Sequence, residues 1–539
     1  SAKSAVEEAG EDKAEDLVKA AAKKKAEAVK SKIKTTTGKK GKIVSLTTHF
    51  EGEFTEEELA HWKATRANGT LDLTKIAEPD GTIASRMGDD WYLDFNYLQG
   101  DIYEKLEILE KEKKSLGKEQ YDRQKAKLEA ILPKREAIGQ IALAPNSDFV
   151  NTLEMKDEDG EATTLRRRFT SWIHDLPHGA FGTSSRWEVE GYVKNQQVRG
   201  QDKDLNEAIR LRRRDVANRL FSRFVREELN DEEKTLTEDA YNRTFNFFHV
   251  PDYKKVPMFA DVHSTYEGNP YALTDVQKHG IGRLVNSGGG ILAHEVGTGK
   301  THSGILAVHE SMSRGWTKKP LLVVPSDQNM KQWIATLNQL VPNAKINNLG
   351  NLGVQFEADL SSLKIEDGSW TFMTYGGLER LAFKDETYDK LTAAFAYAVD
   401  DLEAHRTARE AEKAKQRVLE TEGKMRRGAR RDLFFEDLGF DHFTLDEAHN
   451  ANHIISKVKL EKGQASEFNQ FSQRSSEIGI KTWIATKYIQ DRNDGRNVNL
   501  LTATPFTNHP LEYYSMLSLV ADKALDRMGG KNVNEFFGM

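Results

Sequence analysis

The stretch "HEVGTGKTH" at residues 294–302 decides how the rest of this chain is interpreted. Gly297 and Gly299 allow backbone N–H groups to close around a phosphate, and a helix beginning at Thr301 would also favour an anion at its N-terminus. Lys300 is expected to reach the β- and γ-phosphates of ATP, and the Thr301 hydroxyl is expected to bind Mg²⁺. The stretch therefore predicts a phosphate-binding loop.

The loop departs from the full phosphate-binding pattern at one position. That pattern has another glycine five residues before Gly299, where this chain has His294. An ordinary glycine-rich turn between a strand and a helix therefore stays open as the alternative for the loop taken by itself.

Two further motifs follow the loop, and each lies where a short apolar run ends. The first is "FTLDEAHN" at residues 443–450, where Asp446 is expected to hold Mg²⁺ and Glu447 to orient or deprotonate the attacking water. The second is "LTATP" at residues 501–505, which supplies two small hydroxyls. Alone, the two acids could simply begin a helix. In this order, the three motifs predict that the chain binds ATP.

The motifs belong to a region in which apolar runs alternate with helical stretches. These runs are "GGGILAHE", "KPLLVVP", "SWTFMTY", "FDHFTLDE" and "NVNLLTATP". Strands separated by helices predict an α/β fold with a parallel sheet covered on both faces. Ligands of such sheets bind beyond the carboxyl ends of the strands, where all three motifs fall. A charged helical insertion is expected at about 384–436.

Changes in composition predict four parts of the chain. Residues 1–45 are rich in Ala, Lys and Glu, which favours a charged linker or tail. A small α+β region is expected at 46–145 and a mostly helical region at 146–265. The ATP-binding lobe is expected to occupy 266–539.

Residues 101–133 predict a helical hairpin that turns at Gly117 and ends at Pro133. Its expected apolar seam comprises Leu106, Ile108, Leu109, Leu128 and Leu132.

Two arginine runs lie in the helical region, at 166–168 and 212–214. Arginine on a helix can follow a phosphate backbone. The acidic neighbours Asp215, Glu227 and Glu228 favour ordinary surface ion pairs instead.

Composition excludes several classes of protein. The 539 residues are 38% hydrophobic and 30% charged, with a net charge of −6, so any nucleic-acid site must be a local basic patch. The chain has no cysteine, which excludes disulfides, thiolate metal sites and cysteine nucleophiles. No apolar run is long enough to span a membrane, and no signal peptide opens the chain.

The order of "HEVGTGKT", "LLVVPSDQNMKQW", "MTYGGL", "LDEAHN" and "LLTATPFTNHP" resembles the first motor lobe of helicase superfamily two, which has a RecA-like fold. The "VVP…QW" and "TP…N…E" details resemble its Swi/Snf branch of duplex-DNA translocases. The resemblance implies that Gln277 contacts adenine and that His449 couples the acidic pair to Thr502 and Thr504. It further implies that Ser326, Lys331 and the turn of Gly376 and Gly377 face the DNA backbone. The alternative that these residues are simply buried in the core, or exposed without a function, stays open.

The expected site therefore has three overlapping groups. The catalytic group is Lys300, Asp446, Glu447 and His449. The nucleotide-binding group is Gln277, Gly297, Thr298, Gly299, Lys300 and Thr301, and the expected Mg²⁺ ligands are Thr301 and Asp446. The DNA-binding group is Ser326, Lys331, Gly376, Gly377, Thr502 and Thr504.

The segments "WYLDFNYLQGDIYEKLEIL" and "AYNRTFNFF" and the stretch "SQRSS" at 472–476 resemble large phage and mobile-element proteins. These fuse an adenine-N6 DNA methyltransferase to a Swi/Snf-like helicase and include the DarB-like antirestriction proteins. The chain has no "NPPY"-type motif, so methyl transfer is not expected. The second motor lobe, whose arginine can raise the rate by ~10³ or more, is expected downstream of Met539. The chain alone would then hydrolyse ATP poorly, as a fragment or a processed product.

Two classes of function follow. The first is the motor lobe of a phage-type DNA helicase or translocase in the bacterial cytoplasm, connected with antirestriction or DNA ejection. The second is a structural or cargo protein that is packaged in a virion and has virion proteins as partners. A small-molecule kinase is disfavoured, because "DEAH" and "TATP" have no place in one.

Overall fold

The computed structural model describes residues 41–145, 147–156, 160–194, 196, 198, 203–352, 364–391, 433–455, 475–505, 510–527, 530, 533 and 536. Most of the predicted tail (1–45), most of the predicted insertion (384–436) and most of "SQRSS" lie outside the described residues.

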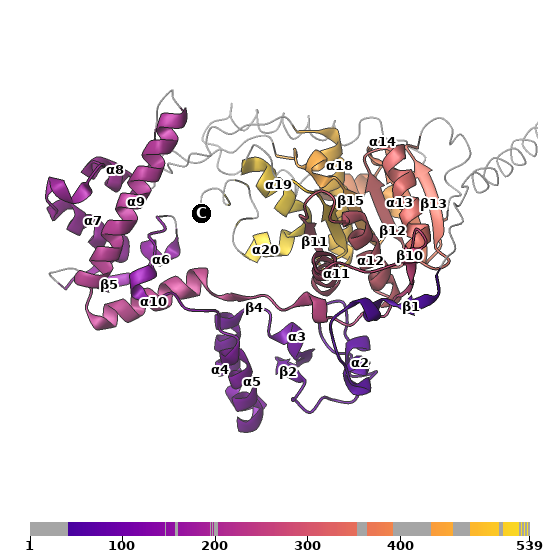
Figure 1. Ribbon diagram of the computed structural model, residues 1–539, viewed down its shortest axis with the longest axis horizontal. Helices are drawn as coiled ribbons and strands as arrows, with labels where there is room; N and C mark the ends of the chain where they lie inside the picture. The colour runs from indigo at the N-terminus through magenta and orange to yellow at the C-terminus, as the bar shows by residue number, and fades with distance from the viewer. Residues whose placement is uncertain are drawn as a thin grey trace, which may run out of the picture.

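A six-stranded sheet forms the centre of the C-terminal lobe (Figure 1), and every pair of neighbouring strands in it is parallel. In spatial order the strands are β11 (Gly289–Leu292), β16 (Val498–Leu501), β15 (His442–Asp446), β12 (Pro320–Val324), β14 (Ser369–Thr374) and β13 (Lys345–Gly350). The predicted α/β fold with a parallel sheet is confirmed. All five apolar runs that predicted strands contain one.

The sixth strand, β13, was missed by the sequence prediction. It lies at the edge of the sheet and pairs only with β14 in that sheet. Its sequence, "KINNLG", has little apolar content, because an edge strand buries less of its surface than a central one. Periodicity therefore gives no strong signal there.

Both faces of the sheet are buried, as predicted. Alternate residues of β12 enter different hydrophobic clusters, with Leu321 and Val323 in one and Leu322 and Val324 in the other. Helices α11 (Asp275–Ser287), α12 (Lys300–Ser313) and α13 (Asp327–Leu340) cover one face; α14 (Tyr375–Arg380), α17 (Phe435–Leu438), α18 (Glu477–Arg492), α19 (Pro510–Val520) and α20 (Asp522–Arg527) supply the other.

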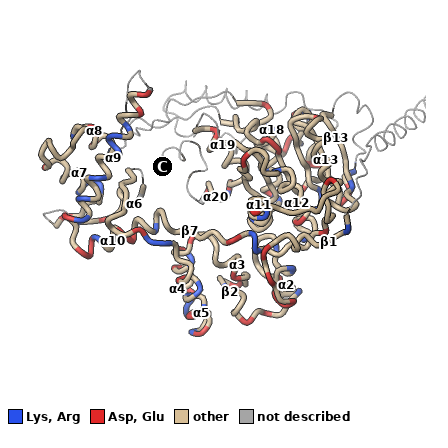
Figure 2. Tube along the Cα trace, viewed as in Figure 1, with Lys and Arg blue, Asp and Glu red and all other residues tan. Residues whose placement is uncertain are grey.

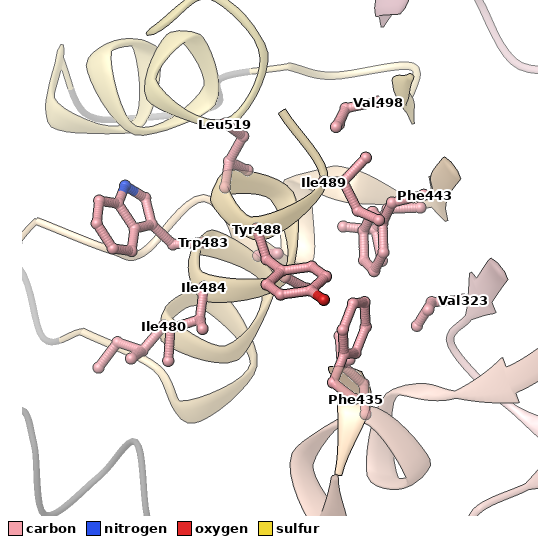
Figure 3. Close-up of a cluster of buried hydrophobic side chains, with 14 of the residues drawn as sticks. Val323, Phe435, Phe443, Ile480, Trp483, Ile484, Tyr488, Ile489, Val498 and Leu519 are labelled. Carbon is pink, nitrogen blue, oxygen red and sulfur yellow. The ribbon is translucent and has the colours of Figure 1, made fainter. Parts of the chain in front are cut away.

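Helix α18 is the central element of the second face (Figure 3). Its residues 479–490 are all buried, Tyr488 packs against Phe435, and Ile489 lies near Phe443. A helix surrounded on all sides by packed side chains holds the carboxyl ends of β15 and β16 at a fixed spacing.

The N-terminal part of the described chain packs onto the lobe. β1 (Ile43–Ser45) pairs antiparallel with β8 (Asp261–His263), and Trp62 of α2 (Glu56–Lys63) joins the same cluster as helices α11 to α13. The elements that follow are β2 (Ala84–Met87), β3 (Asp90–Leu93), α3 (Asp94–Tyr97) and β4 (Gly100–Asp101), which pairs with β7 (Phe248–His249).

Glu310, near the end of α12, fastens this N-terminal part to the lobe. Its carboxylate accepts hydrogen bonds from the backbone N–H groups of Phe259 (2.8 Å) and Ala260 (2.8 Å). Arg314 binds Glu310 at 2.7 Å and donates to the carbonyl of Pro257 at 2.6 Å. Both charged side chains are buried, so the C-terminal end of α12 is held to the segment just before β8.

The predicted helical hairpin is present as α4 (Ile102–Leu116) and α5 (Lys118–Ala130), joined at Gly117 with φ +75°. Leu109 and Leu128 of the predicted seam are buried, and Leu106 and Leu132 pack against them. Ile108 is not a member of this cluster, which gains Ile102 and Tyr121 instead.

A separate helical region has its own core and lies to the left in Figure 1. Its elements are α6 (Asp148–Asn151), β5 (Glu154–Lys156), β6 (Ala162–Thr164), α7 (Leu165–Asp175), α8 (Arg186–Val193), α9 (Lys203–Glu227) and α10 (Asp231–Phe245). Phe169, Phe221 and Phe224 pack together at its centre. The predicted domain limits stay a prediction. Within the described ranges, no helix is long and apolar enough to cross a membrane.

Candidate nucleotide-binding motor site

The predicted phosphate-binding loop connects β11 to α12 at the carboxyl end of the sheet. Helix α12 begins at Lys300, one residue before the predicted start. Gly297 and Gly299 have φ of +83° and +80°, a conformation that side chains with a Cβ rarely adopt. The Lys300 ammonium lies inside the loop and donates to the carbonyls of His294 (3.1 Å) and Glu295 (3.3 Å). The loop therefore has the shape that a phosphate cradle requires.

Gln277 lies directly beside this loop. Its Oε1 accepts a hydrogen bond from the backbone N–H of Thr274 at 2.9 Å, which caps α11. A Cβ at position 299 would lie 2.2 Å from the Nε2 atom of Gln277. Because Gly299 has no side chain, Gln277 packs against the loop, where its amide can contact a nucleotide base. Its contact with adenine stays a prediction.

Asp446 ends strand β15 and is buried. The indole Nε1 of Trp333 donates to its Oδ2 at 2.8 Å. Burial raises the pKa of the Asp446 carboxyl above its usual value, while the Trp333 hydrogen bond and the charge of Lys300 act in the opposite direction. Lys300 and Asp446 are thus close enough to interact electrostatically, although they lie 146 positions apart in the chain.

Glu447 adopts the left-handed backbone conformation, with φ +50° and ψ +49°. Three donors lie near its carbonyl oxygen: Tyr375 Oη at 2.9 Å, the Asn450 backbone N–H at 3.0 Å and Asn450 Nδ2 at 3.1 Å. Backbone strain of this kind persists only where surrounding contacts hold it, and it gathers at functional sites. The surrounding structure therefore holds the backbone from which this carboxylate projects.

His449 connects the acidic pair to the threonine turn. Its Nδ1 lies 3.0 Å from Thr502 Oγ1 and 3.3 Å from Glu447 Oε2. Thr502 Oγ1 accepts the backbone N–H of Thr504 at 3.1 Å, and the Thr502 N–H donates to Leu292 at the end of β11. A continuous set of contacts therefore joins the ends of β15, β16 and β11.

The residues predicted to face DNA lie in different environments. Ser326 caps α13, its hydroxyl accepts the Asn329 N–H at 3.3 Å, and Lys331 on the same helix is exposed. Gly377 is buried, and a Cβ there would lie 2.5 Å from the carbonyl of Gly350, so packing alone requires this glycine. Gly376 has more room around it. The DNA contacts of these four residues, and of Thr502 and Thr504, stay predictions.

The donors around the loop suit Mg²⁺. Thr301 supplies a half-buried hydroxyl and Asp446 a carboxylate with one oxygen bound to Trp333, and hard oxygen ligands of this kind are those that Mg²⁺ prefers. Among the described residues there is no group of three or more His, Asp and Glu side chains that could hold a metal by itself. A cation here would need oxygens from the nucleotide as well, as is usual for Mg²⁺ with phosphates.

Two residues of the site were missed by the sequence prediction. Trp333 lies in the core, and its N–H also binds Asp446. Tyr375, next to the Gly376–Gly377 turn, contacts the carbonyls of Asp446 (2.5 Å) and Glu447 (2.9 Å). A signal in the sequence exists for Tyr375, which directly follows β14, whereas Trp333 lies within α13 and has no such signal.

Comparison with known proteins gives a family for this lobe. Residues 270–505 match the family model described as "Type III restriction enzyme, res subunit". The chain is also 24% identical over 359 residues to "Defense against restriction protein B" of Escherichia phage P1. The family match spans all six strands of the parallel sheet and the loop around Lys300.

The match to the phage protein covers 54% of this chain and 15% of that protein. The chain therefore spans about a seventh of the length of the phage protein. A solved structure, the Sulfolobus solfataricus SWI2/SNF2 ATPase core in complex with dsDNA, is 16% identical with a TM-score of 0.27. That comparison covers 47% of this chain and 37% of the solved one. The likeness to the phage protein agrees with the DarB-like resemblance of the sequence.

Proposed function

We propose that the helicase lobe binds ATP with Mg²⁺ and couples ATP hydrolysis to movement along, or remodelling of, DNA. The observation that carries this proposal is the arrangement at the carboxyl end of the sheet, where the Lys300 ammonium lies inside the glycine loop and the buried Asp446 carboxylate ends β15. A cation held within a glycine loop, beside a buried carboxylate that can hold a metal, is the arrangement that stabilises a triphosphate.

Each residue of the site has a separate task. Lys300 and the amides of the loop from Gly297 to Thr301 bind the phosphates, and Gln277 contacts the base. Mg²⁺ held by Thr301 and Asp446 would neutralise developing charge on the phosphates. Glu447 accepts a proton from the attacking water, and its constrained backbone keeps the carboxylate in one position.

His449 and Thr502 transmit the state of the nucleotide to the surface that contacts DNA. The hydrogen bond between them joins the acidic pair to the turn ending at Thr504. We place Ser326, Lys331, Gly376 and Thr504 along the DNA backbone, and a second RecA-like lobe on the opposite side of the nucleotide. The printed name of the phage relative supports a role in antirestriction, exercised in the bacterial host's cytoplasm.

The proposal is tested by measuring ATP binding and hydrolysis with and without duplex DNA. We expect Mg²⁺-dependent binding of ATP, and hydrolysis that DNA stimulates once a second lobe is supplied. Absence of ATP binding at millimolar nucleotide and Mg²⁺ would contradict the proposal.

A further inference from the structure

Helix α9 carries four arginines on one side, far along the molecule from the helicase lobe (Figure 1). Arg212, Arg219, Arg223 and Arg226 follow one another at spacings of seven, four and three residues. At 3.6 residues per turn, these spacings align the side chains in a single row, called here the arginine stripe. All four residues are exposed. The row is about 21 Å long, from 1.5 Å per residue.

The other side of α9 is buried, so the direction of the stripe is set by packing. Ala217, Phe221 and Phe224 are at most 1% exposed and lie in the core of the helical region. The stripe also has lateral support, because Arg219 donates to the carbonyl of Ala180 at 3.1 Å and Arg223 lies over the ring of Trp172. Side chains placed in this way lose little entropy on binding a ligand.

The charge of the segments that form α7, α8 and α9 is opposite in sign to that of the whole protein. Segments 165–194 and 203–227 contain thirteen Lys and Arg against seven Asp and Glu, a net charge of +6, whereas the full chain has −6. Figure 2 shows the basic residues recurring along α9 and on α7. A local basic patch on an acidic protein is the electrostatic footprint of a polyanion site.

The ion pairs of the stripe do not occupy its binding capacity. Arg212 pairs with Glu188 and Arg223 with Glu227, and their side chains are 41% and 47% exposed. Exposed pairs of this kind are weak, so a phosphate can replace the carboxylate. The hydrogen bonds found for each of the four arginines engage one nitrogen, whereas a guanidinium has five N–H donors.

An exposed aromatic side chain lies on α8, the helix that carries the partner of Arg212. Trp187 is 82% exposed and directly precedes Glu188, the partner of Arg212. A flat exposed ring beside arginines can stack on a base or a sugar of a nucleic acid.

We propose that the arginine stripe binds the phosphate backbone of DNA, as a second DNA contact outside the helicase lobe. The choice of DNA as the polyanion rests on the proposed function, but the contact requires no ATP. A row of about 21 Å matches roughly twelve phosphate charges of a duplex at 1.7 Å per charge, more than enough for four arginines. The surface ion pairs expected from the sequence are present, and they hold the arginines in place until DNA binds.

The test compares the full chain with a variant carrying Arg219→Gln, Arg223→Gln and Arg226→Gln. Binding to a mixed-sequence 20-base-pair duplex is measured without nucleotide at several salt concentrations. The matched control carries Lys111→Gln, Lys114→Gln and Lys118→Gln, which removes the same charge from exposed positions of the helical hairpin. Each lost phosphate contact lowers the slope of log K against log salt by about 0.9, so we expect the slope to fall by roughly two to three in the arginine variant and by less than one in the control.

A variant with the same three arginines changed to lysine keeps the charge and is expected to retain most of the slope. Equal slopes for wild type, arginine variant and control would contradict DNA binding by the arginine stripe. They would not contradict the proposed DNA contacts of the helicase lobe. Absence of DNA binding by the wild type at low salt would overturn both. Loss of ATP binding in Lys300→Ala, with the duplex slope unchanged, would confirm that the stripe acts independently of the nucleotide.

Discussion

Trp333 Nε1 donates a hydrogen bond of 2.8 Å to Asp446 Oδ2, and both side chains are buried. Trp333 lies on α13 and Asp446 at the end of β15, 113 residues apart. The contact ties the carboxylate proposed to hold Mg²⁺ to the hydrophobic core under the sheet. It stabilises the charged form of an aspartate whose pKa is raised by burial.

Trp333→Phe tests this relationship. The variant loses the donor, so the pKa of Asp446 should rise further above its usual value. A carboxyl with a higher pKa takes up its proton at a higher pH. The ionised form of Asp446 is therefore lost earlier as the pH falls. We therefore expect Mg²⁺-dependent ATP binding to fail at a higher pH in the variant than in wild type. Thermal shift with nucleotide across a pH series measures this, and coincident pH profiles would contradict it.

Lys300→Ala removes the cation from the phosphate-binding loop. Its ammonium bonds two carbonyls of the same loop, so the fold should lose little stability. Saturating ATP at about 100 times Kd should stabilise wild type by about 2.7 kcal/mol, and the variant should show almost none of this. Lys345→Ala, on the exposed edge strand, is the control. Equal stabilisation of all three proteins would place Lys300 away from the phosphates.

Glu447→Gly separates backbone strain from chemistry. Glycine adopts φ +50° without steric cost, whereas alanine does not. We expect Glu447→Gly to be more stable than Glu447→Ala by about 1 kcal/mol in urea unfolding. Glu447→Gln should retain ATP binding and abolish hydrolysis in a protein that has both lobes. If Glu447→Gly is the less stable of the two, the left-handed conformation is not maintained in solution.

Glu310→Ala tests the lock at the far end of α12. The substitution leaves Arg314 buried without its carboxylate and removes the acceptor for Phe259 and Ala260. Breaking a buried pair in this way costs about 3–5 kcal/mol. Glu119→Ala breaks the exposed pair with Arg123 and should cost less than about 1 kcal/mol. Urea unfolding measures both, and similar losses would show that the lock does not stabilise the lobe.

Thr502→Val tests the link between nucleotide and DNA. Valine has the same shape but no hydroxyl for His449 or for the Thr504 N–H. We expect ATP binding to persist and the stimulation of hydrolysis by DNA to fall, measured in a protein with both lobes. Full stimulation in the variant would mean that the coupling takes another route.

Local features of the sequence predicted the helicase lobe. Apolar runs alternating with helical stretches indicated the parallel sheet, because a strand buried on both faces must be apolar throughout. The order of the loop, the acidic pair and the threonine turn predicted a nucleotide site, because parallel strands bring their carboxyl ends to one edge. The hairpin was predicted from Gly117, whose φ of +75° suits glycine.

Tertiary structure alone decided which side chains support that site. Trp333 and Tyr375 meet the acidic pair because β12 lies between β15 and β14 in the sheet, and the spatial order of strands is not encoded in local spacing. The same holds for Glu310, which finds its partners in a segment about 50 residues earlier in the chain. On α9 the spacing of the arginines was visible in the sequence, but their shared exposed side depended on which face the core covered. Motif chemistry is local, whereas burial, strain and side-chain partners depend on long-range packing.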